Sequence, residues 1–280
     1  MSILIADSGS TKTDWVLLHQ GEIINECQTI GFSPYFQTSE TIATEIKTIL
    51  LPQLKNNLSL VSHIYYYGTG CSTSEKIDVI KKALTLSLGT ITSEINHDLL
   101  ASARALCGNQ KGIACILGTG SNSCLYDGNT IAENVTSYGY LFGDHGSGAV
   151  LGKTLVQHYF DNQLPKHLHE AFEQAGYNRE VILDNVYKKP MPNRYLASLC
   201  LFLAQHQNDV YVRGLIKNCF IDFFTHQVAH YTNSSNLPVN AVGSVAFHFK
   251  ILFEEVANQL GYSVGKIIQS PIEGLIKYHS

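Results

Sequence analysis

The start of the chain places a carboxylate, several hydroxyls and a lysine around one glycine. Apolar residues predict a buried strand that ends at Asp7, and Gly9 predicts a tight turn directly after it. The N–H groups of such a turn, the hydroxyls of Ser10 and Thr11 and the amine of Lys12 are donors suited to phosphate oxygens. Carboxylate oxygen is the ligand that Mg²⁺ prefers, so we expect Asp7 to hold a magnesium ion through water.

Two other interpretations apply to this hairpin. It could be an ordinary hairpin with a polar tip. It also resembles a Walker loop superficially, but that motif needs a glycine directly before its lysine and a helix after it. Ser10 and Thr11 precede Lys12, and the apolar run from Trp15 to Leu18 predicts a strand. We therefore reject the Walker interpretation and leave the ordinary hairpin open.

A second glycine turn repeats this arrangement about a hundred residues later. An apolar strand is predicted over residues 113–117, followed by Gly118, Thr119 and Gly120 and then by another strand over residues 123–126. One glycine-rich turn is weak evidence, but two in the same setting indicate a duplicated domain. We expect the two turns to face each other across a cleft and to contact phosphate from its two sides.

Further along the chain, the pattern predicts a strand near residues 90–95 and then an Ala-rich helix that Gly108 ends. Asp98 lies at this junction and could serve as a general base, or it could simply cap the helix. Pro52 is expected to end a helix that begins near Ser39, and Ser72 is expected to cap the next one. From residue 146 onward helices dominate.

The composition limits the class of protein. The chain has 280 residues, 45% of them hydrophobic and 15% charged, with a net charge of −4. This balance fits a globular protein and gives no electrostatic footprint for nucleic acid or an acidic membrane. There is no apolar run of membrane-spanning length and no signal peptide, so we expect a cytoplasmic protein. The seven cysteines form no Cys-x-x-Cys pair and are interpreted as reduced core residues; an iron–sulfur site shared across a dimer is the main alternative.

Five motifs in order resemble one known family over essentially the whole chain. Residues 7–13 and 118–122 are similar to its two phosphate motifs, and residues 242–246 to its adenosine motif. Residues 143–148 (GDHGSG) resemble its Gly-Asp-Glu-Gly-Ser-Gly signature, and residues 96–98 the site of its catalytic aspartate. The chain thus resembles the sugar kinase/Hsp70/actin superfamily and, within it, the N-acetylglucosamine kinase-like branch of the BadF/BadG/BcrA/BcrD ATPase family.

The resemblance implies an α/β fold with two ribonuclease-H-like (actin-like ATPase) domains around a central cleft, over residues 1–110 and 111–268. Helical additions are expected in the second domain, and a C-terminal helix within residues 269–280 is expected to pack back on the first. It implies a homodimeric kinase that transfers the γ-phosphate of ATP, with Mg²⁺, to an N-acetylated amino sugar at O6, with Asp98 as general base. Gly243 and Ser244 would bind the nucleotide. The implied sugar-binding residues are Ser33, Gly70, Asn122, Asp144 and His145.

Two residues depart from the family pattern. His145 stands where the family usually has glutamate, and Ser33 stands where asparagine often lies. Both positions are expected near the sugar, and a partly cationic His145 would favour an acidic acceptor such as N-acetylmuramic acid over N-acetylglucosamine. Two other functions stay open: an ATPase that activates a dehydratase or reductase through an iron–sulfur cluster, and a non-catalytic sugar sensor. Because Asp7 lies near the start of this sequence, we expect no DNA-binding segment before it of the kind that related repressors carry.

Overall fold

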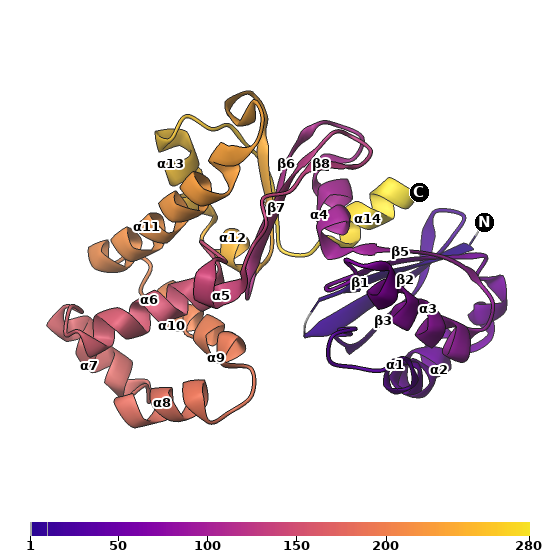
Figure 1. Cartoon of the computed structure of the whole chain (residues 1–280), viewed down its shortest axis with the longest axis horizontal. Helices are drawn as coiled ribbons and strands as arrows, with labels where there is room; N and C mark the ends of the chain where they lie inside the picture. Colours follow the sequence, from indigo (N-terminus) through magenta and orange to yellow (C-terminus); the bar gives the residue numbers. More distant parts are fainter. Residues whose placement is uncertain (1, 10) are drawn as a thin grey trace. The chain divides into compact units, whose positions relative to one another are not determined.

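The computed structural model describes residues 2–9 and 11–280. The chain forms two compact units. The first contains the N-terminal part of the chain up to Gly108 together with Pro271–Ser280, and the second is Asn109–Ser270 (Figure 1). The final segment therefore belongs to the first unit, although the whole second unit separates the two in sequence.

The first unit is built on a five-stranded sheet in the order β3-β2-β1-β4-β5. The first three strands form an antiparallel meander, and the other two run parallel to β1. Its strands are β1 (Ser2–Ser8), β2 (Lys12–His19), β3 (Glu22–Ile30), β4 (His63–Gly68) and β5 (Thr92–His97). Because β1, β4 and β5 are parallel, their carboxyl ends, which carry Asp7, Gly68 and His97, lie at one edge of the sheet.

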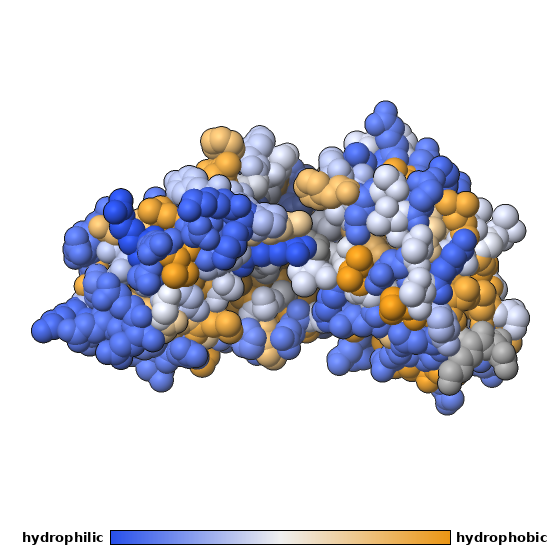
Figure 2. Space-filling view, turned by 90° about the horizontal axis from the view of Figure 1, so that it is seen from below, coloured by the Kyte–Doolittle hydropathy of each residue, from blue (hydrophilic) through white to orange (hydrophobic). Residues whose placement is uncertain are grey.

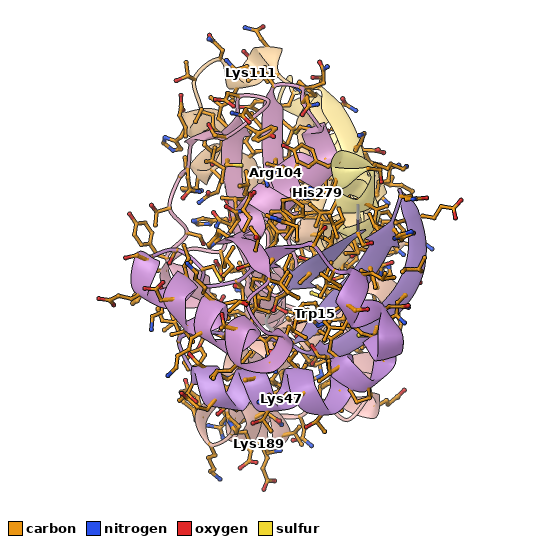
Figure 3. The ribbon with its side chains drawn as sticks, turned by 90° about the vertical axis from the view of Figure 1, so that its right-hand side faces the viewer. Trp15, Lys47, Arg104, Lys111, Lys189 and His279 are labelled. Carbon is orange, nitrogen blue, oxygen red and sulfur yellow. The ribbon has the colours of Figure 1, made fainter. Side chains whose placement is uncertain are left out.

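Helices cover both faces of this sheet (Figure 1). One face carries α1 (Ser39–Glu45), α2 (Leu51–Leu54) and α3 (Ser74–Leu88). A π-helical turn over Ile46–Leu50 joins α1 to α2, and a 3₁₀-helical segment over Lys55–Leu60 leads from α2 to β4. Trp15 (labelled in Figure 3) is buried in the core of this unit. Its ring contacts those of Phe32 and Tyr66. The other face carries α4 (Asp98–Cys107) and α14 (Ile272–His279), which pack against each other.

The second unit repeats the topology. Its sheet has the order β10-β9-β6-β7-β8, again with an antiparallel meander and two strands parallel to the first. Its strands are β6 (Gly112–Leu117), β7 (Ser121–Tyr126), β8 (Ile131–Glu133), β9 (Val239–Val242) and β10 (Val264–Ile268). The hairpin β6–β7 thus corresponds to β1–β2. The predicted α/β fold with a duplicated actin-like domain is confirmed.

Helices make up most of the second unit outside its sheet. They are α5 (Gly139–Phe142), α6 (Gly148–Phe160), α7 (Lys166–Gln174), α8 (Arg179–Tyr187), α9 (Pro192–Ser198), α10 (Cys200–Gln205), α11 (Val210–His226), α12 (Ser244–His248) and α13 (Lys250–Gln259), with short turns over Val228–His230 and Ser234–Asn236. Buried aromatic residues of α11 and α13 pack with α6 and one face of the sheet in a single core. The run from α7 to α11 between β8 and β9 accounts for the helical additions expected here.

Two predicted helix boundaries are wrong. The helix from Ser39 does not end at Pro52, because a wide turn intervenes in which the N–H of Leu51 bonds to the carbonyl of Ile46. This turn shifts the hydrogen-bond register and places Pro52 in the first turn of α2, where a missing N–H does no harm. The cap of α3 is Thr73, whose side chain accepts from the N–H of Lys76, so the cap lies one residue later than Ser72.

None of the helices in the described residues is long and apolar enough to cross a membrane. On the face drawn in Figure 2, apolar side chains lie in separate groups among polar ones. None of the seven cysteines forms a disulfide within the described residues, and five of them are buried, as predicted from their apolar surroundings.

Candidate functional site

In the first unit, the β1–β2 hairpin places Asp7 directly opposite Asp14 in the strand register. The tip is closed by a hydrogen bond from the N–H of Gly9 to the carbonyl of Lys12, 3.0 Å long. The Lys12 side chain is 54% exposed, and its amine lies 2.9 Å from an oxygen of Asp14. Lys12 is therefore paired with Asp14 rather than free at the turn. Ser10 lies outside the described residues.

Asp7 is a carboxylate in an environment that disfavours its charge. Burial, followed by repulsion from Asp98 and Asp14, raises the pKa of Asp7 to about 7, and the nearby Lys12 opposes this only in part. Lys12 can neutralise only one negative charge. The local charge therefore remains negative when Asp7, Asp14 and Asp98 are all ionised. Among the described residues, no group of three or more His, Cys, Asp or Glu side chains is arranged to hold a metal ion directly. The excess of negative charge therefore fits a divalent cation such as Mg²⁺ that Asp7 holds through water.

Asp98 is the first residue of α4, but it is not the residue that caps the helix. His97 is the N-cap, and its Nδ1 accepts the N–H of Leu99 at 3.1 Å. The interpretation of Asp98 as a plain helix cap is therefore wrong. The Asp98 side chain is 24% exposed and lies close enough to Asp7 to influence its pKa. Its carboxylate is available to act on a bound molecule.

His97 also affects Asp98 directly, since its Nδ1 lies 2.7 Å from Asp98 Oδ1. That nitrogen can either accept from Leu99 or, when protonated, donate to Asp98, but it cannot do both. In the first state the buried Oδ1 has no hydrogen-bond partner among the described residues. Burial lowers the pKa of His97, but the hydrogen bond and the charge of Asp98 outweigh it and raise the pKa overall.

Two loops of the first unit carry the predicted sugar-binding residues Ser33 and Gly70. The N–H of Ser33 donates to Gln37 Oε1 at 2.7 Å, which fixes the loop backbone, and Ser33 itself is partly exposed. Gly70 has a positive φ of 80°, and a Cβ there would lie 2.9 Å from the ring of Tyr35. The two loops therefore pack closely against each other, and only glycine fits at position 70.

In the second unit, the turn after β6 is tied to the start of α6. The carbonyls of Gly118 and Thr119 accept the N–H groups of Gly148 and Ala149, at 2.8 and 3.0 Å. In the described part of the chain, no carbonyl accepts the N–H groups of Thr119 and Gly120. These two donors are thus held on a fixed turn and are available for an anion.

Gly243 packs against the same turn. Its φ is 121°, and a Cβ there would lie 2.4 Å from the carbonyl oxygen of Leu117 and 3.2 Å from the nitrogen of Gly118. Ser244 follows as the first residue of α12. Glycine is therefore required at 243 both for its backbone angle and for this close approach.

Asp144 lies on the other side of the turn. A Cβ on Gly120 would lie 2.8 Å from Asp144 Oδ2. The other oxygen, Oδ1, accepts the hydroxyl of Ser137 at 2.5 Å, and the same hydroxyl accepts the N–H of Asp144. Asn122 is partly exposed on β7, and its side-chain Oδ1 accepts from Asn134 Nδ2 at 3.1 Å. The structure brings Asp144 against the glycine turn and leaves an Oδ2 that a ligand hydroxyl could contact.

His145 is stacked on His226, with ring centroids 4.4 Å apart. Burial, followed by the charge of His226, lowers the pKa of His145. The lowered pKa favours the neutral side chain and does not support the partly cationic His145 that was expected. Its backbone carbonyl accepts the hydroxyl of Ser121 at 2.8 Å, which holds it beside β7.

The candidate residues thus form one group in each unit. In the first unit the group surrounds Asp7 and Asp98, and in the second it surrounds the turn at residues 118–120. Sequence reasoning missed His97 as the cap of α4 and Ser137 as the partner of Asp144. His97 was detectable, since it stands directly before the aspartate at a helix start, whereas Ser137 had no signal because its contact crosses an irregular loop.

Two five-stranded units of this topology, each with a glycine turn after its first strand, define the actin-like ATPase fold. Neither a family model nor a curated protein sequence matches the chain. Among solved structures, MreB 5 of Spiroplasma citri bound to AMPPNP shares this fold at 10% identity, covering 99% of this chain and 95% of that one, with a TM-score of 0.59.

Two other solved structures are named “Putative N-acetylglucosamine Kinase”. The protein from Chromobacterium violaceum is 15% identical, covers 100% of this chain and 99% of its own, and has a TM-score of 0.72, which shows the fold alone. The protein from Porphyromonas gingivalis is 43% identical over 99% of this chain and 98% of its own, with a TM-score of 0.94. The chain belongs to the family of this P. gingivalis protein.

Proposed function

We propose that the chain is an ATP-dependent kinase of an N-acetylated amino sugar, in the N-acetylglucosamine kinase-like branch of the BadF/BadG/BcrA/BcrD ATPase family. The observation that carries the proposal is the placement of Asp98. Its carboxylate directly follows the carboxyl end of β5, is not the cap of α4, and is close enough to Asp7 to affect the pKa of Asp7. The identity of 43% to the P. gingivalis protein supports the choice of acceptor.

Asp98 acts as the general base in this proposal. A hydroxyl of the sugar, which we propose to be O6, forms a bond to the γ-phosphorus of ATP. The bond between that phosphorus and the β,γ-bridging oxygen breaks, its electrons leave with ADP, and the hydroxyl proton passes to Asp98. His97 modulates this step, since a protonated Nδ1 that donates to Asp98 lowers the basicity of the carboxylate.

Asp7 orients Mg²⁺ through water in this proposal. The negative charge that raises its pKa is the charge that a divalent cation would neutralise. When bound, the ion neutralises charge on the transferring phosphates. The surroundings proposed for the ion stay negatively charged, because the nearby cation, Lys12, is already paired with Asp14.

Each unit carries donors on its hairpin that we propose as contacts for phosphate. In the second unit, the free N–H groups of Thr119 and Gly120 serve this role on the turn that begins at Gly118. In the first unit, Ser10, Thr11 and Lys12 are the proposed contacts. For Lys12 this requires exchange from Asp14 to phosphate, a modest change for an exposed ion pair. Gly243 and Ser244 contact the adenosine in this proposal.

Each unit contributes residues that we propose to contact the acceptor. Ser33 and Gly70 belong to the two packed loops of the first unit, and Asn122, Asp144 and His145 to the second. Sites of this kind discriminate strongly, because an analogue that lacks a hydroxyl leaves a buried polar group unpaired. A neutral His145 favours a neutral sugar, so we propose N-acetylglucosamine ahead of N-acetylmuramic acid.

The iron–sulfur and sensor alternatives gain no support from the site. An iron–sulfur activator needs exposed cysteine ligands, and five of the seven cysteines are buried. We also propose a homodimer, which light scattering of the purified chain would test.

The test is a panel of acceptors in an assay that couples ADP formation to a colour change. N-acetylglucosamine, N-acetylmuramic acid and glucosamine are supplied separately with ATP and Mg²⁺. We expect ADP formation that depends on an N-acetylated sugar and is fastest with N-acetylglucosamine. ADP formation that no sugar stimulates, or a protein that purifies with bound iron, would contradict the proposal.

A further inference from the structure

A chain of buried hydroxyls joins the first hairpin to the loop that carries Ser33. The N–H of Phe32 donates to Ser8 Oγ at 3.2 Å, Ser8 Oγ lies 2.8 Å from Thr13 Oγ1, and Thr13 Oγ1 donates to the carbonyl of Ile30 at 3.0 Å. Because Thr13 gives its only proton to Ile30, Ser8 must donate to Thr13. The direction of donation in this series of hydrogen bonds is thus fixed. It runs from the N–H of Phe32 to Ser8, from Ser8 to Thr13, and from Thr13 to the carbonyl of Ile30.

The four groups form a clip, by which we mean Ser8, Thr13, Ile30 and the N–H of Phe32. The side chains of Ser8 and Thr13 are fully buried. Burial matters because a buried hydroxyl that loses its partner costs more free energy than an exposed one. The backbone carbonyl of Ser8 also accepts the N–H of Thr69 at 2.9 Å, so the loop that contains Gly70 starts from the same point.

The clip determines where the loop that carries Ser33 leaves the sheet. Phe32 is anchored twice, by its ring in the core against Trp15 and by its N–H on Ser8. Ser33 is the next residue, and its side chain is partly exposed. A shift of the Phe32 backbone would therefore move Ser33 directly.

The hairpin does not need these hydroxyls for its own pairing. Strand β2 is held between β1 and β3 by backbone hydrogen bonds along its length. Removing the hydroxyl of Thr13 therefore leaves the strand register in place, while the bond to the carbonyl of Ile30 and the acceptor of the Ser8 hydroxyl are lost. This separates a loss of positioning from a loss of fold.

We propose that Ser8 and Thr13 are positioning residues, which fix the loop of Ser33 on the phosphate-binding hairpin so that acceptor and phosphate are held in register. The role in sugar affinity rests on the proposed kinase function, whereas the hydrogen bonds of the clip do not. It predicts that the hydroxyl chain determines the affinity for the sugar more than the affinity for ATP.

The experiment compares Thr13→Val, which keeps the shape and removes the hydroxyl, with Thr13→Ser, which restores it. Ser87→Ala is the matched control, because Ser87 is a buried serine of the same unit that donates to the carbonyl of Ala83 at 2.7 Å. Loss of one buried hydrogen bond corresponds to roughly a 2- to 12-fold effect. We expect Thr13→Val to raise the KM for N-acetylglucosamine about 5-fold and the KM for ATP less than 2-fold, and Thr13→Ser and Ser87→Ala to resemble the wild type.

Amide hydrogen exchange provides a readout that does not depend on activity. In Thr13→Val, the amide of Phe32 should exchange faster, while the amides of β2 keep their protection. If the wild type phosphorylates no sugar, the proposed function fails, but exchange at Phe32 still tests the clip. Unchanged exchange at Phe32 would overturn the inference. So would faster exchange with an unchanged sugar KM, an equal rise in both KM values, or a Thr13→Ser variant that behaves like Thr13→Val.

Discussion

Gly243→Ala tests how the phosphate turn of the second unit is built. An alanine Cβ at this position would lie 2.4 Å from the carbonyl oxygen of Leu117 and 2.7 Å from its carbon. Both atoms belong to the backbone, so neither can move aside as a flexible side chain would. The substitution must displace the turn that presents the N–H groups of Thr119 and Gly120.

The magnitude follows from two separate effects. A φ of 121° is unfavourable for alanine by about 1–3 kcal/mol, and the forced shift of a packed backbone costs about 1–3 kcal/mol more. Alanine restricts the unfolded chain and so recovers about 0.4–1 kcal/mol. We therefore expect a loss of about 3 kcal/mol, which corresponds to a fall in Tm of roughly 6–12 °C.

The chain offers a matched control in the same unit. Gly176 also has a positive φ, 87°, but a Cβ there would meet nothing within 4 Å. Gly176→Ala should therefore lose only about 1 kcal/mol through backbone strain, with an unchanged affinity for nucleotide. The difference between the two variants isolates the contact with Leu117.

The assay is calorimetric titration with a non-hydrolysable ATP analogue, alongside thermal unfolding of each variant. We expect Gly243→Ala to weaken nucleotide binding about 10-fold or more, because misplaced donors lose hydrogen bonds to phosphate. If both variants bound nucleotide as tightly as the wild type, the account of this turn would be refuted. A Gly243→Ala protein as stable as Gly176→Ala would refute the steric part.

Four further outcomes are expected. Asp98→Asn should lower kcat for sugar phosphorylation about 10²–10⁴-fold in steady-state assays while leaving sugar binding within about 3-fold; near-normal turnover would exclude it as the base. Asp7→Asn should abolish the Mg²⁺ dependence of nucleotide binding. Because the pKa of Asp7 is raised to about 7, the wild type in metal-free buffer should lose stability as the pH rises from about 4 to 7, and the variant should not. His97 has a raised pKa, so its interaction with Asp98 stabilises the fold fully below pH about 6.5 and is lost as the pH rises through the folded pKa. In denaturant unfolding, His97→Asn should therefore lower the free energy of unfolding more at pH 6 than at pH 9. Gly120→Ala would place a Cβ 2.8 Å from Asp144 Oδ2, so the KM for sugar should rise several-fold, and an unchanged KM would argue against a sugar contact by Asp144.

The duplicated fold was predictable because both copies carry the same local signals. Each begins with an apolar strand, a glycine turn and a second strand, and the alternation of apolar and polar segments set the order of the rest. The observed sheets confirm this down to the correspondence of β1–β2 with β6–β7. Boundaries were less accurate where hydrogen-bond register changed within a helix, as before Pro52, since a wide turn leaves no mark in the spacing of apolar residues.

The site was predictable in its residue types but not in its contacts. Asp98 was identified from its place between a strand and a helix, yet only the structure shows that His97 caps the helix instead. The pairing of Lys12 with Asp14 depends on which face of β2 each side chain takes. The lowered pKa of His145 depends on burial and on His226, which lies far away in sequence and stacks on His145 in the fold. Contacts of this kind arise from tertiary packing, and no local pattern encodes them.

The central claim is that this chain transfers phosphate from ATP to an amino sugar, and the ³¹P NMR spectrum of one reaction mixture tests it most directly. The mixture contains the purified chain, ATP, Mg²⁺ and N-acetylglucosamine. We predict a new phosphomonoester resonance that grows as ATP is consumed and is coupled to the protons on C6 of the sugar. A spectrum in which ATP persists unchanged, or in which only ADP and inorganic phosphate form, would contradict the account.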